Sequence, residues 1–101
     1  MLLAGVGVAA PAGGATAQLP APPLEGTHAC RPAPFVTHLR VRSATCRRAR
    51  QVSHFWESGG RCPAGWRFRR YALPAGVEAT GGSYLSCRHG SARVFWAENG
   101  E

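Results

Sequence analysis

The sequence contains no aspartate and no lysine, and these two absences restrict the chemistry that the chain can perform. A hydrolase that works with paired carboxylates needs two acids in fixed positions. The acidic side chains are five glutamates, of which only Glu57 lies close to predicted regular structure. The other four lie in a proline-rich stretch, a predicted loop and the expected frayed end: Glu25, Glu78, Glu98 and Glu101. The composition therefore argues against a glycosidase.

The patterns of nucleophilic catalysis are also missing. The chain has no Gly-x-Ser-x-Gly segment, and Ser53 and His54 are neighbours on a predicted helix, so their side chains diverge. The number of cysteines is even, which favours disulfides over a free catalytic thiol. We therefore predict that the protein is not an enzyme.

A zinc site is considered because histidine and cysteine lie two residues apart at two places. These are His28-x-Cys30 and Cys87-x-His89. Neither spacing matches a zinc finger or a zinc ribbon. We predict no metal and no other cofactor, with His28 in a solvated segment and His89 in a turn.

No apolar run is long enough to cross a membrane as a helix. Residues 2–10 are apolar but short, and an Ala-x-Ala pattern follows at residues 15–17. This combination predicts a signal peptide over residues 1–17 and no membrane span after its removal. Residues 18–34 contain five prolines and are predicted to be an extended tether without regular structure. Residues 35–98 then form one small domain.

Four cysteines remain after the predicted cleavage, and they indicate two disulfides and no free thiol. In an exported chain this pattern predicts a secreted or envelope-associated protein. Four cysteines allow three connectivities. We favour Cys46–Cys87 and Cys30–Cys62, because the alternation of its strand turns Cys87 towards the helix.

One helix is predicted over residues 44–60. Five residues there recur at steps of three and four, the period of one helical face: Cys46, Ala49, Val52, Ser53 and Trp56. Thr45 is a suitable N-cap, and Gly59 or Gly60 suits the left-handed position that ends a helix.

Alternating segments predict strands at residues 35–42, 66–72, 83–88 and 91–97, with a turn at His89-Gly90. The predicted fold is α+β, with one helix on a mainly antiparallel sheet of three to four strands in the order β-α-β-β-β. The predicted core comprises Phe35, Leu39, Val41, Cys46, Ala49, Val52, Trp56, Trp66, Phe68, Leu85, Cys87, Val94 and Trp96.

The same alternation places basic side chains on the face of the sheet away from the helix. They are Arg40, Arg42, Arg67, Arg69, Arg88 and Arg93, joined by His38 and Phe95. With a net charge of +7, such a face favours anionic partners, because arginine binds phosphate, sulfate and carboxylate groups bidentately. A composition rich in Arg, Ala, Gly and Pro is also typical of a GC-rich genome, which is the alternative explanation.

Short motifs in residues 36–96 resemble a recurrent small exported domain of actinobacteria. They are ATCRRAR at the helix start, CPAGW, SCRHG and ARVFW. The resemblance implies export and disulfides but no reaction. Many members carry another cysteine two residues after the Trp, where this chain has Phe68, so the resemblance assigns no partner to Cys62.

These observations predict an exported, small, basic, non-enzymatic domain with a structural or protein-interaction role. Its partner would be another exported protein. The alternative is binding of an anionic polymer, an envelope polysaccharide or a nucleic acid, through the arginine face. A second alternative is a protease inhibitor or toxin-like module, for which residues 73–82 are the candidate exposed loop. An interaction module would show an apolar patch, for which Phe55 and Phe95 are candidates.

Overall fold

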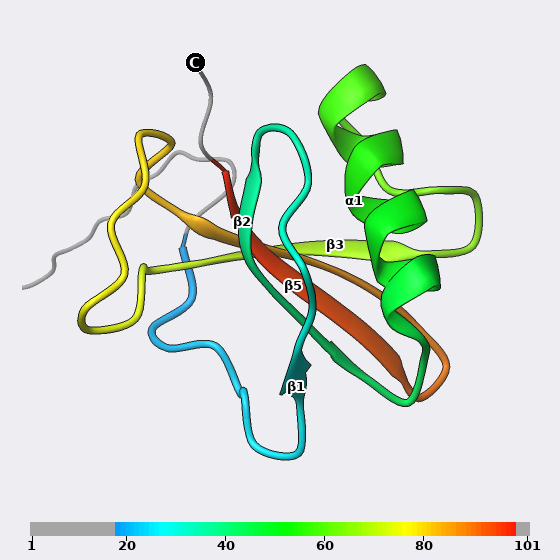
Figure 1. Ribbon diagram of the computed structural model, residues 1–101, viewed down its shortest axis with the longest axis horizontal. Coiled ribbons are helices and arrows are strands. Elements are labelled where there is room, and N and C mark those ends of the chain that lie inside the picture. The colour runs from blue at the N-terminus through cyan, green and yellow to red at the C-terminus, as the bar shows by residue number, and fades with distance from the viewer. Residues whose placement is uncertain (1–17, 99–101) are drawn as a thin grey trace, which may run out of the picture.

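The computed structural model describes residues 18–98, so the predicted signal peptide lies outside the described residues. The elements are β1 (His28–Ala29), β2 (Val36–Arg42), α1 (Cys46–Gly59), β3 (Arg67–Tyr71), β4 (Tyr84–His89) and β5 (Ala92–Glu98). The strands form one sheet in the order β1-β2-β5-β4-β3, and all neighbours are antiparallel (Figure 1). The α+β class with one helix is confirmed, but the sheet has five strands because β1 was not predicted.

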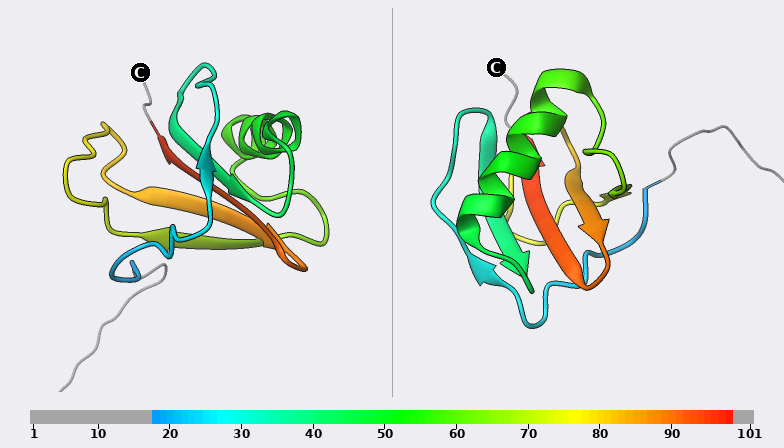
Figure 2. Two further views of the ribbon diagram at one scale, coloured as in Figure 1. Left: turned by 60° about the horizontal axis from the view of Figure 1, so that its bottom comes forward. Right: turned by 90° about the vertical axis from the view of Figure 1, so that its right-hand side faces the viewer.

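The helix forms where its apolar spacing and capping residues predict it. Thr45 is the N-cap, and its hydroxyl accepts a hydrogen bond from the Arg48 amide at 3.0 Å. Gly60 ends the helix in the left-handed conformation (φ 76°), and its amide donates to the Trp56 carbonyl. The right-hand view of Figure 2 shows α1 lying across β2 and β5.

The predicted alternation of β2 fails at its beginning. Val36 is fully buried, whereas Phe35 is 57% exposed and was wrongly placed in the core. The pairing of β2 with β5 shifts between Thr37 and Arg40, and His38 between them has φ 54°. This irregularity inserts an extra residue, so the side chains before it change face while those after it keep the predicted one.

The proline-rich segment is more ordered than predicted. β1 pairs with β2, and the Cys30 amide donates to the Leu39 carbonyl at 2.8 Å. Earlier in the segment, Leu19 bridges to Tyr71 on the outer edge of β3. The prediction of a tether without regular structure is therefore wrong, because backbone groups at both sheet edges were available to bind it.

The space between α1 and the sheet holds the main core. With the exception of Phe35, the predicted core residues are buried or packed against this core. Trp96 is fully buried in it, and its ring meets the ring of Trp56 edge to face at 6.1 Å. Ser53 is buried too, and its hydroxyl donates to the Ala49 carbonyl at 2.9 Å.

The opposite face of the sheet carries a second, aromatic core. Phe95 is fully buried there, between Tyr71 and Tyr84. Partly buried side chains of the proline-rich segment and of the loop after β3 cover it: Leu24, Leu73, Val77 and Ala79. Phe95 is therefore not the exposed aromatic of a basic face, and it forms no apolar surface patch with Phe55.

Two disulfides are present, as predicted, and no described cysteine is free, but the favoured pairing is wrong. The bonds are Cys30–Cys46, which ties the segment after β1 to the start of α1, and Cys62–Cys87, which ties the chain after α1 to β4. Because β1 joins the sheet beside β2, it brings Cys30 next to the helix start. Cys87 then remains within reach of Cys62.

Candidate anion-binding site

Four arginines lie side by side across four strands on the face of the sheet away from α1. The strand register pairs Arg42 with Arg93, Arg93 with Arg88, and Arg88 with Arg67. Directly paired residues in antiparallel strands share a face and lie about 5 Å apart. We call Arg42, Arg93, Arg88 and Arg67 the arginine row.

The arginine row lies beside the turn that joins β4 to β5. The turn consists of Gly90 and Ser91, one residue later than predicted, since His89 pairs with Ala92. The Arg93 guanidinium donates to the carbonyls of Gly90 and Ala92, at 2.6 and 2.9 Å. These bonds hold Arg93 at the end of the sheet.

The N-terminal segment holds the Arg42 end of the row. One Arg42 nitrogen donates to the backbone carbonyls of Glu25, at 2.6 Å, and Pro23, at 3.3 Å. The Arg42 guanidinium therefore contacts the main chain at Glu25. The accepting carbonyl groups are uncharged and do not neutralise its positive charge.

The next row towards the aromatic core contains Arg40, Phe95, Ser86 and Arg69. Arg40 donates to the Thr27 hydroxyl at 2.7 Å and to the Thr27 carbonyl at 3.0 Å. It thus fixes the N-terminal segment. Arg69 lies beside the arginine row, and its side chain makes no hydrogen bond to another residue of 18–98.

The charges of the row act on one another. Burial lowers the pKa of Arg88, and the positive charges of Arg69, Arg93 and Arg67 lower it further. Tyr71 opposes this shift, and no carboxylate of residues 18–98 contributes to it. The structure thus concentrates positive charge around Arg88, and no acidic side chain in the described part of the chain balances it.

A hollow of about 220 Å³ opens at this end of the sheet. Its lining is almost entirely polar or cationic: Gly65, Arg67, Arg88, His89, Gly90 and Arg93. The His89 ring stacks on Trp66 with 5.4 Å between ring centroids, and the Arg48 guanidinium lies 5.7 Å from the Trp66 ring. The hollow can accept an anionic group that three guanidinium groups reach together.

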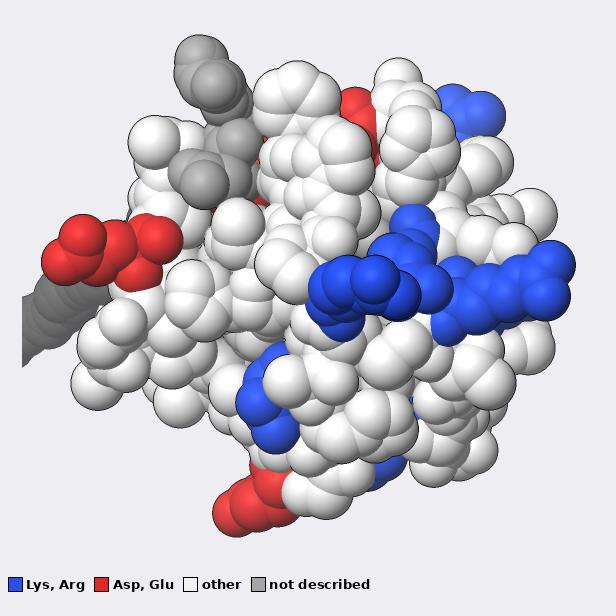
Figure 3. All heavy atoms as spheres, viewed as in Figure 1, with Lys and Arg blue, Asp and Glu red and all other residues white. Residues whose placement is uncertain are grey.

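Basic side chains also occur on the other side of the molecule. Figure 3, viewed from the side that carries α1, shows them gathered over the region of the helix. Arg47 and Arg48 are exposed there. This surface offers a comparison for the row, because its arginines are not aligned across strands.

Sequence reasoning missed a pair of carboxyl groups on the helix side. Glu57 near the end of α1 and Glu98 at the end of β5 are hydrogen-bonded through their side chains. Burial raises the pKa of Glu57 to about 7; the Trp96 indole, which donates to Glu57 at 3.1 Å, opposes this, and Glu98 adds to it. Glu98 was expected to lie in a frayed end. The pair forms because β5 extends to Glu98, which the sequence pattern did not predict.

The other predicted sites are separated or covered. His28 lies beside the Cys30–Cys46 disulfide, whereas His89 stacks on Trp66 near the arginine hollow. The loop over residues 73–82, the candidate inhibitor loop, places Val77 against the aromatic core. Phe55 is 43% exposed and lines a shallow groove with Arg48 and Pro63.

Within residues 18–98, the one helix is neither long nor apolar enough to cross a bilayer. No family model, no curated protein and no solved structure matches the chain.

Proposed function

We propose that the protein binds an anionic polymer through the arginine row and its adjoining hollow. The observation that carries this proposal is the register, which sets Arg42, Arg93, Arg88 and Arg67 opposite one another. Like charges in directly opposed positions destabilise a sheet. An anionic partner would remove this repulsion, so the arrangement favours the bound state over the free one.

The geometry suits a polymer better than a small anion. The row extends over four strands, and neighbouring strands lie about 5 Å apart, so its charges span about 15 Å. A single phosphate or sulfate would contact only the part of the row beside the hollow. A chain of such groups lying across the strands would contact all four guanidinium groups.

The cellular setting is part of the proposal. The two disulfides are compatible with an oxidising, extracellular environment. We propose an exported domain, as the motifs resembling the actinobacterial group imply, whose partner is an anionic envelope polymer. A non-enzymatic structural role would follow from such retention at the envelope.

The test is retention on an anionic-polysaccharide column. It compares a variant that loses three charges of the arginine row with a control variant that loses three charges elsewhere on the surface. The first combines Arg67→Gln, Arg88→Gln and Arg93→Gln. The second combines Arg31→Gln, Arg47→Gln and Arg61→Gln, three exposed positions outside the row. Arg40 is left intact, because it binds Thr27 and its loss would disturb the fold.

We expect the row variant to elute at much lower salt than the control variant. The slope of log affinity against log salt should fall by about 2 to 3 for the row variant, as the loss of three contacts requires. Equal elution of the two variants would show that binding follows net charge alone, and the proposed site would be wrong.

A further inference from the structure

The two disulfides lie in different surroundings. Cys87 is fully buried and Cys62 is 8% exposed, and both belong to the main core. Cys30 and Cys46 are only partly buried and lie between β1 and the first turn of α1. A reagent in solution can therefore reach the Cys30–Cys46 bond, while the core shields Cys62–Cys87.

A histidine accompanies the accessible disulfide. A ring nitrogen of His28 and the sulfurs of Cys30 and Cys46 all lie within 4.8 Å of one another. His28 is exposed, so its ring can turn towards the sulfurs. One imidazole and two thiolates are typical ligands of Zn²⁺, with water completing a tetrahedral site.

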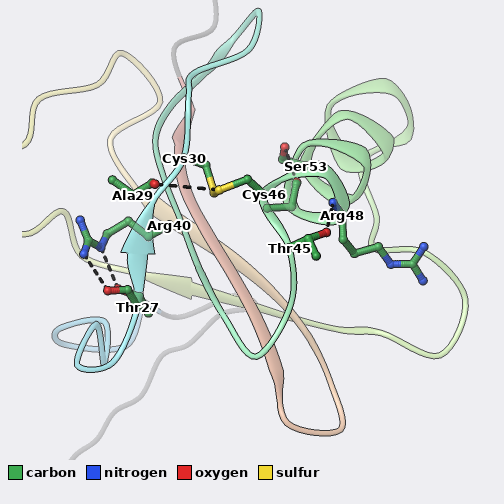
Figure 4. The surroundings of a disulfide bond; sticks show 9 residues. Thr27, Ala29, Cys30, Arg40, Thr45, Cys46, Arg48 and Ser53 are labelled. Atoms are coloured by element: carbon green, nitrogen blue, oxygen red, sulfur yellow. Dashed lines mark hydrogen bonds between the residues drawn. A yellow bond between two sulfur atoms is a disulfide. The ribbon is translucent and has the colours of Figure 1, made fainter.

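The fold holds these ligands together without the disulfide. The Cys30 amide binds Leu39, and Arg40 binds Thr27 on the far side of β1, so the β1 segment stays on the sheet. Cys46 is the first residue of α1 and follows Thr45, the N-cap residue of the helix (Figure 4). Reduction would therefore release the sulfurs from each other but leave them on fixed elements.

The position of Cys46 also suits metal binding. A metal binds the thiolate form of cysteine, and the positive end of a helix dipole favours a negative charge. Cys46 lies in the first turn of α1, and Arg47 and Arg48 follow it.

We propose that the Cys30–Cys46 bond is the selectively reducible disulfide of this protein, and that its dithiol form binds a thiophilic divalent cation together with His28. A dithiol reductant supplies the two electrons: its thiolate attacks one sulfur, the other leaves as a thiolate, and the second reductant thiol then releases the first. Zn²⁺ next binds the two cysteine sulfurs and the imidazole, and the two thiol protons pass to solvent.

The first experiment maps reduction by mass spectrometry after graded dithiothreitol treatment and alkylation of the full chain. We expect Cys30 and Cys46 to be alkylated while Cys62 and Cys87 remain bridged, and circular dichroism to stay that of the oxidised protein. Simultaneous reduction of both bonds, or loss of the fold in the half-reduced chain, would overturn the proposal.

The second experiment adds Co²⁺ to the half-reduced chain after removal of the reductant, and then displaces it with Zn²⁺. We expect a thiolate-to-cobalt charge-transfer band at one equivalent, and no band for the oxidised chain. His28→Gln should weaken binding at least about tenfold. His54→Gln, at an exposed position of α1 eight residues after Cys46, is the matched control and should bind like the parent.

Two outcomes would contradict the metal site. Absence of the cobalt band would show that the three ligands do not converge in the reduced chain. Equal binding by His28→Gln and the parent would show that the imidazole is not a ligand.

Discussion

The two faces of the sheet are built on the same alternation of side chains but are covered in different ways. On one face, α1 covers a core that includes Trp96 and Leu39. On the other, irregular segments cover only the aromatic end around Phe95, and the arginine row lies beyond it. Alternation thus decides which face a side chain occupies, and the covering segments decide whether that face is shielded from water.

The two faces also differ in the charged side chains that lie at their ends. The helix face ends in the carboxyl pair of Glu57 and Glu98, while the coil-covered face ends in the arginine row. Burial and the neighbouring Glu98 raise the pKa of Glu57, whereas the arginines must hold their charges side by side. The following predictions test this contrast.

The largest effect is expected for Phe95→Ala. The variant should lose about 3–5 kcal/mol of unfolding free energy, as for a central core aromatic, because Phe95 is fully buried between two tyrosines. Urea denaturation measures the loss. Phe55→Ala is the matched control, since that ring is 43% exposed and should cost far less. Similar small losses for both would mean that the second face is open.

A smaller effect is expected from pH. The folded state raises the pKa of Glu57 from 4.5 to about 7, so between these values it binds more protons than the unfolded state. The unfolding free energy should therefore fall as pH rises through this window, with the stabilisation complete below 4.5 and lost above 7. Because Glu57 is half-buried, solvent screening limits the change to about 1 kcal/mol.

Thermal melts across this pH range should show the decrease for the parent protein and a flatter profile for Glu57→Gln. Glu78→Gln is a control, since Glu78 is exposed in the loop after β3. A parent profile as flat as that of Glu57→Gln would contradict the raised pKa of Glu57.

The smallest effect is expected for Arg88→Gln. Removing the charge between Arg93 and Arg67 relieves repulsion, so stability should stay constant or rise by a few tenths of a kcal/mol at low salt. The gain should vanish at high salt, where charges are screened. A clear loss of stability would show that Arg88 supports the fold instead of serving a ligand.

The strand alternation predicted much of the candidate site, because β3, β4 and β5 pair regularly over their whole lengths. It failed where the chain departs from regularity. The irregularity at His38 moved Val36 into the core in place of Phe35. The alternation also could not show that the Arg40 side chain is hydrogen-bonded to Thr27, because no sequence pattern connects the two segments that carry these residues.

Local sequence by itself determined the helix, its Thr45 and Gly60 caps, and the facing of most strand residues, because these depend on neighbours within a few positions. Only the tertiary structure decided the disulfide partners, the cover over Phe95, and the meeting of Glu57 with Glu98. Each of these joins residues far apart in the chain. Their proximity follows from the order of strands in the sheet, and above all from β1, whose two residues carry too little pattern to predict.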